Sequence, residues 1–305
     1  MRGEFFSSRL VKLNMKFKDG LFKYIALFCA LCSVIFLFGI ILSIFKEGYP
    51  IFRIFGVVKF LFTRGWYPTH EEASFGILAL ITGSFVVTVG SLIVAIPLGV
   101  GSAIFLSEIA GFKTREILKP FVELLAGIPS VIYGLFGMAF LAPFIMRLFN
   151  LPTGLNAFTT SIILGIMVVP IISSISEDAI SSIPKELREA SYALGANKWE
   201  TIYKVVLPAA KSGIFASISL GFGRAIGETM LVLMVAGGAA VIPKSIFSPV
   251  RPMTSAIAAE MGEAVVGSEH YYALFGIAIV LFVITFFSNL ITESVKRKVM
   301  RAQNL

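Results

Sequence analysis

Two charged residues, Arg224 and Glu228, lie within the apolar stretch Gly213–Ala236. An arginine at the centre of a bilayer costs about 2.5–3.5 kcal/mol on insertion scales, so such residues usually face a bundle interior or a pathway. Because the two residues are four positions apart, one helical turn, they can neutralise each other. We therefore expect an Arg–Glu pair beside a polar pathway. The alternative is a structural ion pair between helices.

The residue types of this pair suit an oxyanion substrate. The guanidinium of Arg224 offers a planar fork of donors, a geometry that matches phosphate. Glu228 would lower the cost of the arginine in the absence of substrate and could accept a hydrogen bond from a protonated phosphate oxygen. Its negative charge would also weaken anion binding, which transport requires because a substrate held too tightly is not released.

The composition of the chain indicates that membrane-spanning helices position this pair. Of 305 residues, 57% are hydrophobic and 14% are charged, against a soluble norm of roughly 25% charged. Apolar stretches long enough to cross a bilayer recur along the chain. We predict six spans, all helical because lipid offers the backbone no hydrogen-bond partners, and thus an all-α polytopic membrane protein. They lie near Phe22–Phe45, Gly76–Leu106, Pro120–Leu148, Ala157–Ser176, Gly213–Ala236 and Tyr272–Ile291.

The net charge of +8 follows the predicted topology and forms no single patch. Lysines and arginines gather at Arg2–Lys23, Lys113–Lys119, Lys185–Lys211 and Lys296–Arg301. By the positive-inside rule, both termini are cytoplasmic and the protein lies in the cell membrane. This distribution argues against nucleic acid as a partner. The first span exceeds the length of a signal sequence, so we interpret it as a retained anchor.

Other conspicuous residues receive simpler interpretations. Cys29 and Cys32 lie inside an apolar span without further metal ligands nearby, so we expect packing residues and no metal site. Trp66 and Tyr67, in a long outer connection, suit an anchor at the level of the lipid headgroups. The glycines and prolines of Gly127–Gly134, together with Pro97, predict broken or kinked helices, which membranes tolerate beside a water-lined pathway.

In the fifth predicted span, Gly223 and Gly227 form a G-x-x-x-G pattern, which predicts close approach of another helix. The Arg224 and Glu228 stripe would then lie beside this packing face.

The cytoplasmic connection after the fourth span reads as two short helices. Pro184 suits a first helical turn and Gly195 a helix end. Asn197 and Glu200 have the spacing of a capping box that begins the second helix, and Pro208 is expected to end it.

This connection resembles the E-A-A motif of ABC importer permeases. The residues that match are Glu189, Ala190, Gly195, Leu207 and Pro208. Ser191 replaces the second alanine of the motif, and Val205 replaces an isoleucine. The resemblance implies a coupling helix that docks in a groove of an ATP-binding cassette ATPase subunit. We expect a polar rim for this contact from Lys185, Glu186, Arg188 and Glu189.

The chain has no Walker A sequence, so we expect no ATPase activity and no cofactor in this subunit. Gly238–Ser245 is a near match, but Pro243 stands where a glycine donates a backbone N–H to phosphate. The segment is also expected on the outer side. ATP hydrolysis is therefore assigned to a partner subunit.

Two further segments resemble phosphate importer permeases. Gly223–Met230 is similar to their G-R-A-I-G-E-T-M segment, and Gly127–Gly134 to their G-I-P-S-x-x-Y-G segment. Arg251–Glu263 is more similar to the PstC branch of this family than to the PstA branch. The resemblance covers about 74–290 and implies a type I ABC importer permease fold. It also implies an extracytoplasmic phosphate-binding protein of the PstS type, a second permease of the PstA type and an ATPase of the PstB type.

We accordingly expect three regions. Residues 1–73 form an arm, the first span and an outer loop, residues 74–294 form the permease domain with the coupling loop at 177–211, and residues 295–305 form a cytoplasmic tail. A permease for molybdate or sulfate stays an alternative. A stand-alone secondary transporter or channel could use Arg224 and Glu228 but would have no reason to carry the E-A-A loop. A scaffold or receptor would leave the buried charges unexplained.

Overall fold

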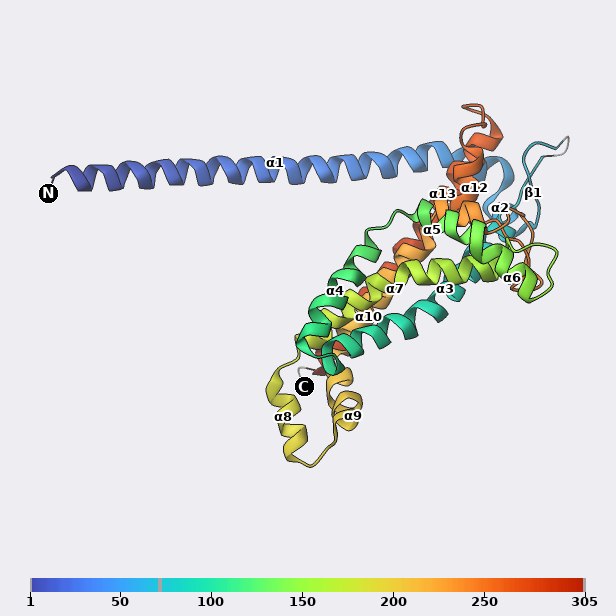
Figure 1. Cartoon of the computed structure of the whole chain (residues 1–305). Helices are drawn as coiled ribbons and strands as arrows, with labels where there is room; N and C mark the ends of the chain where they lie inside the picture. Colours follow the sequence, from blue (N-terminus) through green and yellow to red (C-terminus); the bar gives the residue numbers. More distant parts are fainter. Residues whose placement is uncertain (1, 71–72, 304–305) are drawn as a thin grey trace.

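The computed structural model describes the backbone of residues 2–70 and 73–303, and the side chains of 22–70 and 73–294. The basic side chains predicted at Arg2–Lys18 and Lys296–Arg301 lie outside the described side chains. Six helical segments of the described chain are long and apolar enough to cross a membrane, as predicted. They are Phe22–Phe55, Leu78–Ile109, Ser130–Leu148, Ala157–Ser181, Lys198–Ile226 and Glu269–Ser294. The protein is an all-α, multi-pass membrane protein (Figure 1).

The centre of the bundle is α7 (Ala157–Ser181), which packs against α3 (Leu78–Ile104) and α10 (Leu207–Ile226). Small residues bring these helices together. A Cβ on Gly165 would lie 2.8 Å from Val94 of α3, and a Cβ on Gly221 of α10 would lie 3.0 Å from Ile172. Small residues are the usual means of close helix packing in membranes. α7 is thus the most enclosed span of the bundle.

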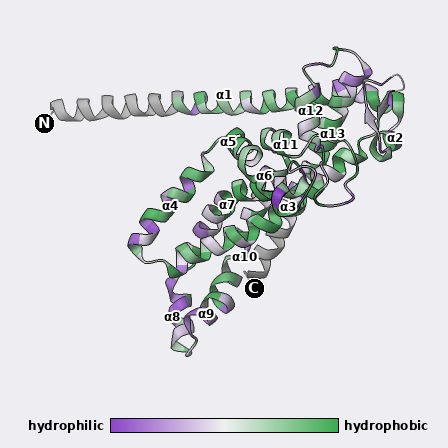
Figure 2. Ribbon diagram, turned by 45° about the vertical axis from the view of Figure 1, so that its right-hand side comes forward, coloured by the Kyte–Doolittle hydropathy of each residue, from purple (hydrophilic) through white to green (hydrophobic). Residues whose placement is uncertain are grey.

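A second cluster joins the first and last helices of the chain at one end of the bundle. It contains α1 (Arg2–Phe55), α2 (Val57–Phe62), α12 (Met253–Glu260), α13 (Glu269–Gln303) and the antiparallel pair β1 (Trp66–Tyr67) and β2 (Ser74–Phe75). α1 meets α13 near its own C-terminal end, where Ile51 lies against Gly276. The apolar stretch that begins at Phe22 extends away from the bundle (Figures 1 and 2). Cys29 is exposed on this stretch, so its predicted packing role has no support within the chain.

The third predicted span is divided by a break, so its bounds Pro120–Leu148 were wrong. The amphipathic helix α4 (Phe112–Ala126) ends at Gly127, and α5 (Ser130–Phe136) begins after Pro129. Proline has no backbone N–H to continue the helix and disfavours helical geometry in the residue before it. A π-helical turn, η2 (Gly137–Leu141), and α6 (Ala142–Leu148) complete the crossing. The predicted break within Gly127–Gly134 is confirmed. Pro97 lies inside the uninterrupted α3.

The fifth predicted span was wrong at both ends. After α8 (Lys185–Ala193) and a short turn, three segments follow one another without a gap. They are α9 (Lys198–Thr201), the π-helical turn η3 (Ile202–Val206) and α10. Pro208 does not end a helix. It lies in the first turn of α10, and the wider turn of η3 precedes it. α10 ends at Ile226, and the short α11 (Met230–Val235) follows a break.

The proposed headgroup anchor at Trp66 was also wrong. Its side chain is only 2% exposed, and its indole N–H donates to both carboxylate oxygens of Glu260, at 3.1 and 2.9 Å. Glu260 of α12 also pairs with Arg251 at 2.5 Å and with His270 at 2.9 Å. The Glu260 carboxylate of α12 therefore holds β1, through Trp66, and the start of α13, through His270, against α12.

Candidate substrate pathway and docking loop

The predicted ion pair between Arg224 and Glu228 is confirmed, but not on a continuous helix. Glu228 follows the end of α10, and its carboxylate Oε2 lies 3.0 Å from Nη1 of Arg224 without hydrogen-bond geometry. Its Oε1 accepts a hydrogen bond from the backbone N–H of Leu231 at 3.3 Å. The hydroxyl of Thr254 in α12 donates to the backbone carbonyl of Glu228 at 2.7 Å. These contacts fix the carboxylate at the break between two helices.

The two partners differ sharply in exposure. Glu228 is 3% exposed, whereas the side chain of Arg224 is 45% exposed. A buried carboxylate would be costly without a counter-charge. Arg224 supplies one while nearly half of its own side chain stays exposed. The site therefore presents a partly neutralised cation toward an open space.

Arg224 lies at a hollow of about 700 Å³ between α10 and α13. Its polar lining also includes Ser219, Asn289, Thr292 and Glu293. Sequence reasoning missed the α13 residues because that helix was interpreted as a plain span. The signal available was a run of polar side chains near the end of an otherwise apolar segment.

The predicted G-x-x-x-G packing is not found among the described residues. A Cβ on Gly223 would meet no heavy atom within 4 Å, and one on Gly227 would meet only the Gly223 carbonyl of the same helix. The close approach to α7 occurs instead at Gly221 and at Gly213, where a Cβ would lie 2.3 Å from Ala179. Within the described residues, the face of α10 that carries Gly223 and Arg224 borders the hollow that separates it from α13.

The predicted helix, turn, helix arrangement of the coupling loop at 177–211, called the docking loop below, is confirmed. Gly195 has φ +86°, the left-handed region that glycine tolerates best. Its N–H donates to the Tyr192 carbonyl at 2.9 Å, which satisfies the end of α8. The predicted capping box is present, because Asn197 accepts from the Glu200 N–H at 2.9 Å and Glu200 accepts from the Asn197 N–H at 3.0 Å.

The five residues of the E-A-A motif fall into two places. Glu189, Ala190 and Gly195 are exposed at the tip of the loop. Leu207 and Pro208 lie where the chain re-enters the bundle, and Leu207 packs against a small buried cluster that includes Ile180 and Val206. The tip can therefore contact a partner, while the second group sets how the tip joins the spans.

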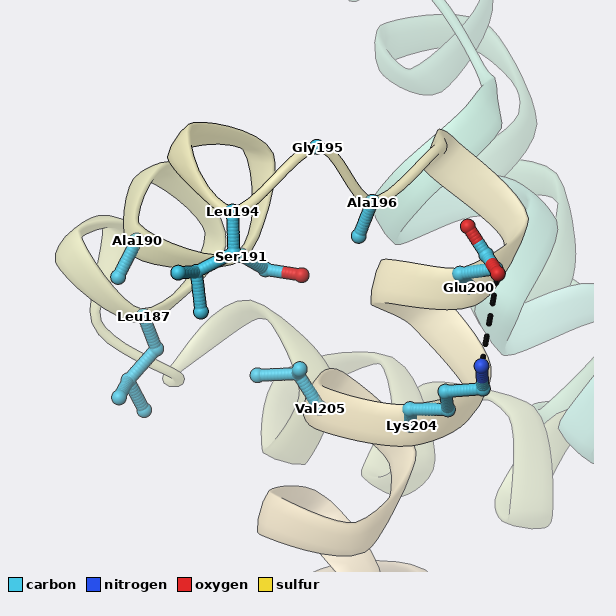
Figure 3. A pocket seen from close by; sticks show the side chains of 9 residues that line it. All are labelled: Leu187, Ala190, Ser191, Leu194, Gly195, Ala196, Glu200, Lys204 and Val205. Carbon is cyan, nitrogen blue, oxygen red and sulfur yellow. Dashed lines mark hydrogen bonds and ion pairs between the residues drawn. The ribbon is translucent and has the colours of Figure 1, made fainter.

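The tip is hollowed between α8 and the helix that follows it (Figure 3). This hollow of about 470 Å³ is lined by Leu187, Ala190, Ser191, Leu194, Gly195, Ala196, Glu200, Lys204 and Val205. The hydroxyls of Ser191 and Thr201 are 2.9 Å apart and buried, which joins its two walls. Leu194 is 90% exposed, and Trp199 and Tyr203 are also exposed. Large exposed apolar side chains with a polar surround mark a protein interaction surface.

Arg188 does not contribute to the expected polar rim. Its guanidinium points into the bundle, where Nη2 donates to Glu108 at 2.7 Å and to the Ile180 carbonyl at 3.0 Å. Nη1 donates to the Ile183 carbonyl at 2.6 Å. Glu108 belongs to η1 (Phe105–Ile109), the π-helical turn that extends α3. Arg188 thus fixes α8 to the ends of both α3 and α7.

A second buried carboxylate, Glu177, was not anticipated from the sequence. It lies near the end of α7 and pairs with Arg115 and Lys119 of α4, the latter at 2.6 Å. Lys119 also contacts Asp178 at 3.0 Å. Donation to the Glu177 carboxylate raises the pKa of Lys119 above its ordinary value, against the opposing effect of partial burial. Its cationic form is therefore stabilised at neutral pH.

Comparison with known proteins agrees with this architecture. The chain belongs to the family of binding-protein-dependent transport system inner membrane components, whose family model matches residues 95–301. Among curated relatives, it is similar to the probable ABC transporter permease protein YqgH of Bacillus subtilis, with 39% identity over 96% of this chain and 97% of that protein. It is also similar to the phosphate transport system permease protein PstC of Mesorhizobium japonicum, with 36% identity over 88% and 86% of the two chains.

Solved structures show the same fold at low sequence identity. A chain of the alginate ABC transporter, solved with its pentasaccharide-bound periplasmic protein, has a TM-score of 0.62 and 17% identity, with 92% of this chain and 96% of that chain covered. A chain of the MetNI methionine ABC transporter has a TM-score of 0.55 and 20% identity, with 73% and 94% covered. The predicted type I ABC importer permease fold is thereby confirmed.

Proposed function

We propose that this chain is the permease subunit of an ATP-driven importer and forms, with a second permease, the membrane pathway for inorganic phosphate. The observation that carries the proposal is the buried Glu228 carboxylate beneath the half-exposed guanidinium of Arg224, at a break between two membrane helices. Similarity to PstC proteins, whose name specifies phosphate transport, supports this choice of substrate.

The proposed partners follow from the two ends of the molecule. An ATPase of the PstB type docks on the tip of the loop through Glu189, Ala190 and Gly195, and hydrolyses ATP. We take this end as cytoplasmic because of the basic residues that flank it, and by the same rule we expect both termini on that side of the membrane. A phosphate-binding protein of the PstS type approaches the opposite end, which carries α12. A second permease of the PstA type completes the pathway.

Transport proceeds by alternating access in this proposal. Closure of the ATPases moves the two docking loops, and the spans turn so that the pathway opens outward and then inward. Phosphate binds the open donors of Arg224, and Glu228 limits the affinity so that release follows. Residues 74–294 form the domain that carries out these steps, with residues 1–73 as an anchor and outer connection and residues 295–305 as a tail.

Reconstitution tests this function directly. The complex of both permeases and the ATPase, in vesicles with phosphate-loaded binding protein outside and ATP inside, should accumulate labelled phosphate. Labelled sulfate and molybdate, each offered with its own binding protein, should not accumulate. Uptake of sulfate or molybdate in place of phosphate would assign a different oxyanion. Phosphate uptake by this chain without ATPase and ATP would indicate a secondary transporter or channel.

A further inference from the structure

α4 is attached to the bundle in a different way from the spans. None of its 15 residues is buried. The partly shielded side chains of α4 are Arg115, Lys119 and Val122, which lie on one face. Arg115 and Lys119 contact α7, and Val122 lines a hollow beside α3. Large apolar residues such as Phe112, Phe121 and Leu124 point away and are exposed. Charged contacts therefore hold α4 against α7, whereas apolar packing holds the other helices together.

Glu177 is the centre of this attachment. Its side chain is 1% exposed, and both carboxylate oxygens are occupied. Arg115 and the Ser181 hydroxyl donate to Oε1, and Lys119 donates to Oε2. Removal of one partner from a buried ion pair is strongly destabilising, because the other charge is left without compensation. The link between α4 and α7 therefore centres on this one buried carboxylate, while Lys119 to Asp178 and Arg115 to the Ser181 hydroxyl, each at 3.0 Å, are its more exposed contacts.

The same end of α7 also holds the docking loop. Ile180, between Glu177 and Ser181, accepts a hydrogen bond from Arg188 of α8 through its carbonyl. α8 begins only a few residues after α7 ends at Ser181. A displacement of α8 must therefore move this end of α7, and with it the carboxylate that holds α4.

α4 leads in turn to the broken third span. The Tyr133 hydroxyl of α5 donates to the Leu125 carbonyl at 2.9 Å and so bridges the break at 127–129. Figure 1 shows this break between α4 and α5. The N–H groups of Gly127 and Ile128 still donate to carbonyls of α4, at 3.0 and 3.3 Å, but the series ends there because Pro129 has no N–H. Movement of α4 can thus change the angle between the two halves of the span.

We propose that Glu177 is a positioning residue that couples the docking loop to the third span, by holding α4 on the end of α7 throughout the transport cycle. Coupling between distant sites is carried by contiguous packed and hydrogen-bonded groups, and Arg188, Ile180, Glu177 and Lys119 form such a series. This inference rests on the proposed function, since it takes α8 as the contact of the ATPase.

The test compares Glu177→Gln with Asp178→Asn in the reconstituted complex, measuring ATP hydrolysis and phosphate uptake together. Asp178 is the matched control because it is adjacent, contacts Lys119 and is exposed. For Glu177→Gln we expect continued ATP hydrolysis and a fall of about tenfold in phosphate imported per ATP, within the usual range for the loss of coupling between two sites. Asp178→Asn should keep the wild-type ratio. A wild-type ratio in Glu177→Gln would overturn the proposal.

A reversible bridge separates this role from a general loss of stability. Cysteines are placed at Lys119 and Asp178 in a chain whose Cys29 and Cys32 are replaced by serine, and a reducible bis-thiosulfonate reagent joins them. We expect a low transport ratio before bridging, recovery after it and loss again on reduction. A bridged protein that hydrolyses ATP but imports no phosphate would show that α4 must leave α7. If the unmodified complex itself lacked phosphate-stimulated ATP hydrolysis, the proposed function would fail independently of Glu177.

Discussion

The turn at Gly195 allows a quantitative prediction for the docking loop. Gly195 has φ +86°, and a Cβ at this position would meet no heavy atom within 4 Å. A Gly195→Ala substitution therefore costs backbone strain alone, about 1–2 kcal/mol for a side chain in the left-handed region. This penalty acts on the end of α8, where the Ala196 N–H donates to the Ser191 carbonyl at 3.2 Å.

Hydrogen exchange measures this penalty at the turn itself. A loss of about 1–2 kcal/mol changes a local equilibrium by a factor of about 5–30. We therefore expect the Ala196 amide to exchange about 5–30 times faster in Gly195→Ala, because exchange follows local opening. Gly195→Asn should show a smaller increase, since asparagine tolerates left-handed geometry better than alanine.

Gly101→Ala is the matched control, because a Cβ there also meets no heavy atom and the residue lies inside α3. Its substitution should leave Ala196 exchange unchanged. An unchanged exchange rate in Gly195→Ala would refute the reasoning, since it would mean that the left-handed turn does not limit the stability of the tip.

Two further substitutions test other parts of the account. Trp66→Phe removes the hydrogen bonds to Glu260 and should destabilise the protein by about 1–2 kcal/mol, measured as a lower midpoint of thermal unfolding in detergent. Tyr67→Phe, at an exposed neighbour, should leave the midpoint unchanged. Equal midpoints for both variants would contradict the buried role of Trp66. Glu228→Gln should weaken discrimination against sulfate by about tenfold, because it loses about 1.5 kcal/mol of charged hydrogen bonding to protonated phosphate. An unchanged preference for phosphate over sulfate, measured by competition uptake, would contradict the assigned role of the carboxylate.

Local chemistry was predictable from the sequence because its determinants are neighbours in the chain. Gly195, Asn197 and Glu200 end one helix and begin the next through contacts that span three residues, so their spacing was sufficient. The pairing of Arg224 with Glu228 was likewise a short-range property. It persisted although the helix ended between them, because the turn at Gly227 keeps the two side chains on one side.

Long-range partners could not be predicted in the same way. The anchor interpretation of Trp66 failed because its acceptor, Glu260, lies 194 positions away. Glu177 and Lys119 are 58 positions apart, and Arg188 and Glu108 are 80 apart. The bounds of the third and fifth spans were also misplaced, because apolar composition continues across a helix end in a membrane and so does not show where each helix begins or ends.

Phosphate uptake by Arg224→Gln tests the central claim most directly. Glutamine keeps a polar side chain of moderate size but removes the cation that would bind phosphate and neutralise Glu228. Arg147→Gln, at an exposed arginine of α6, is the matched control. With both variants inserted and assembled with their partner subunits, we predict that Arg224→Gln abolishes ATP-dependent phosphate uptake and that Arg147→Gln retains it. Uptake at the wild-type rate by Arg224→Gln would contradict the assignment of Arg224 to the phosphate pathway.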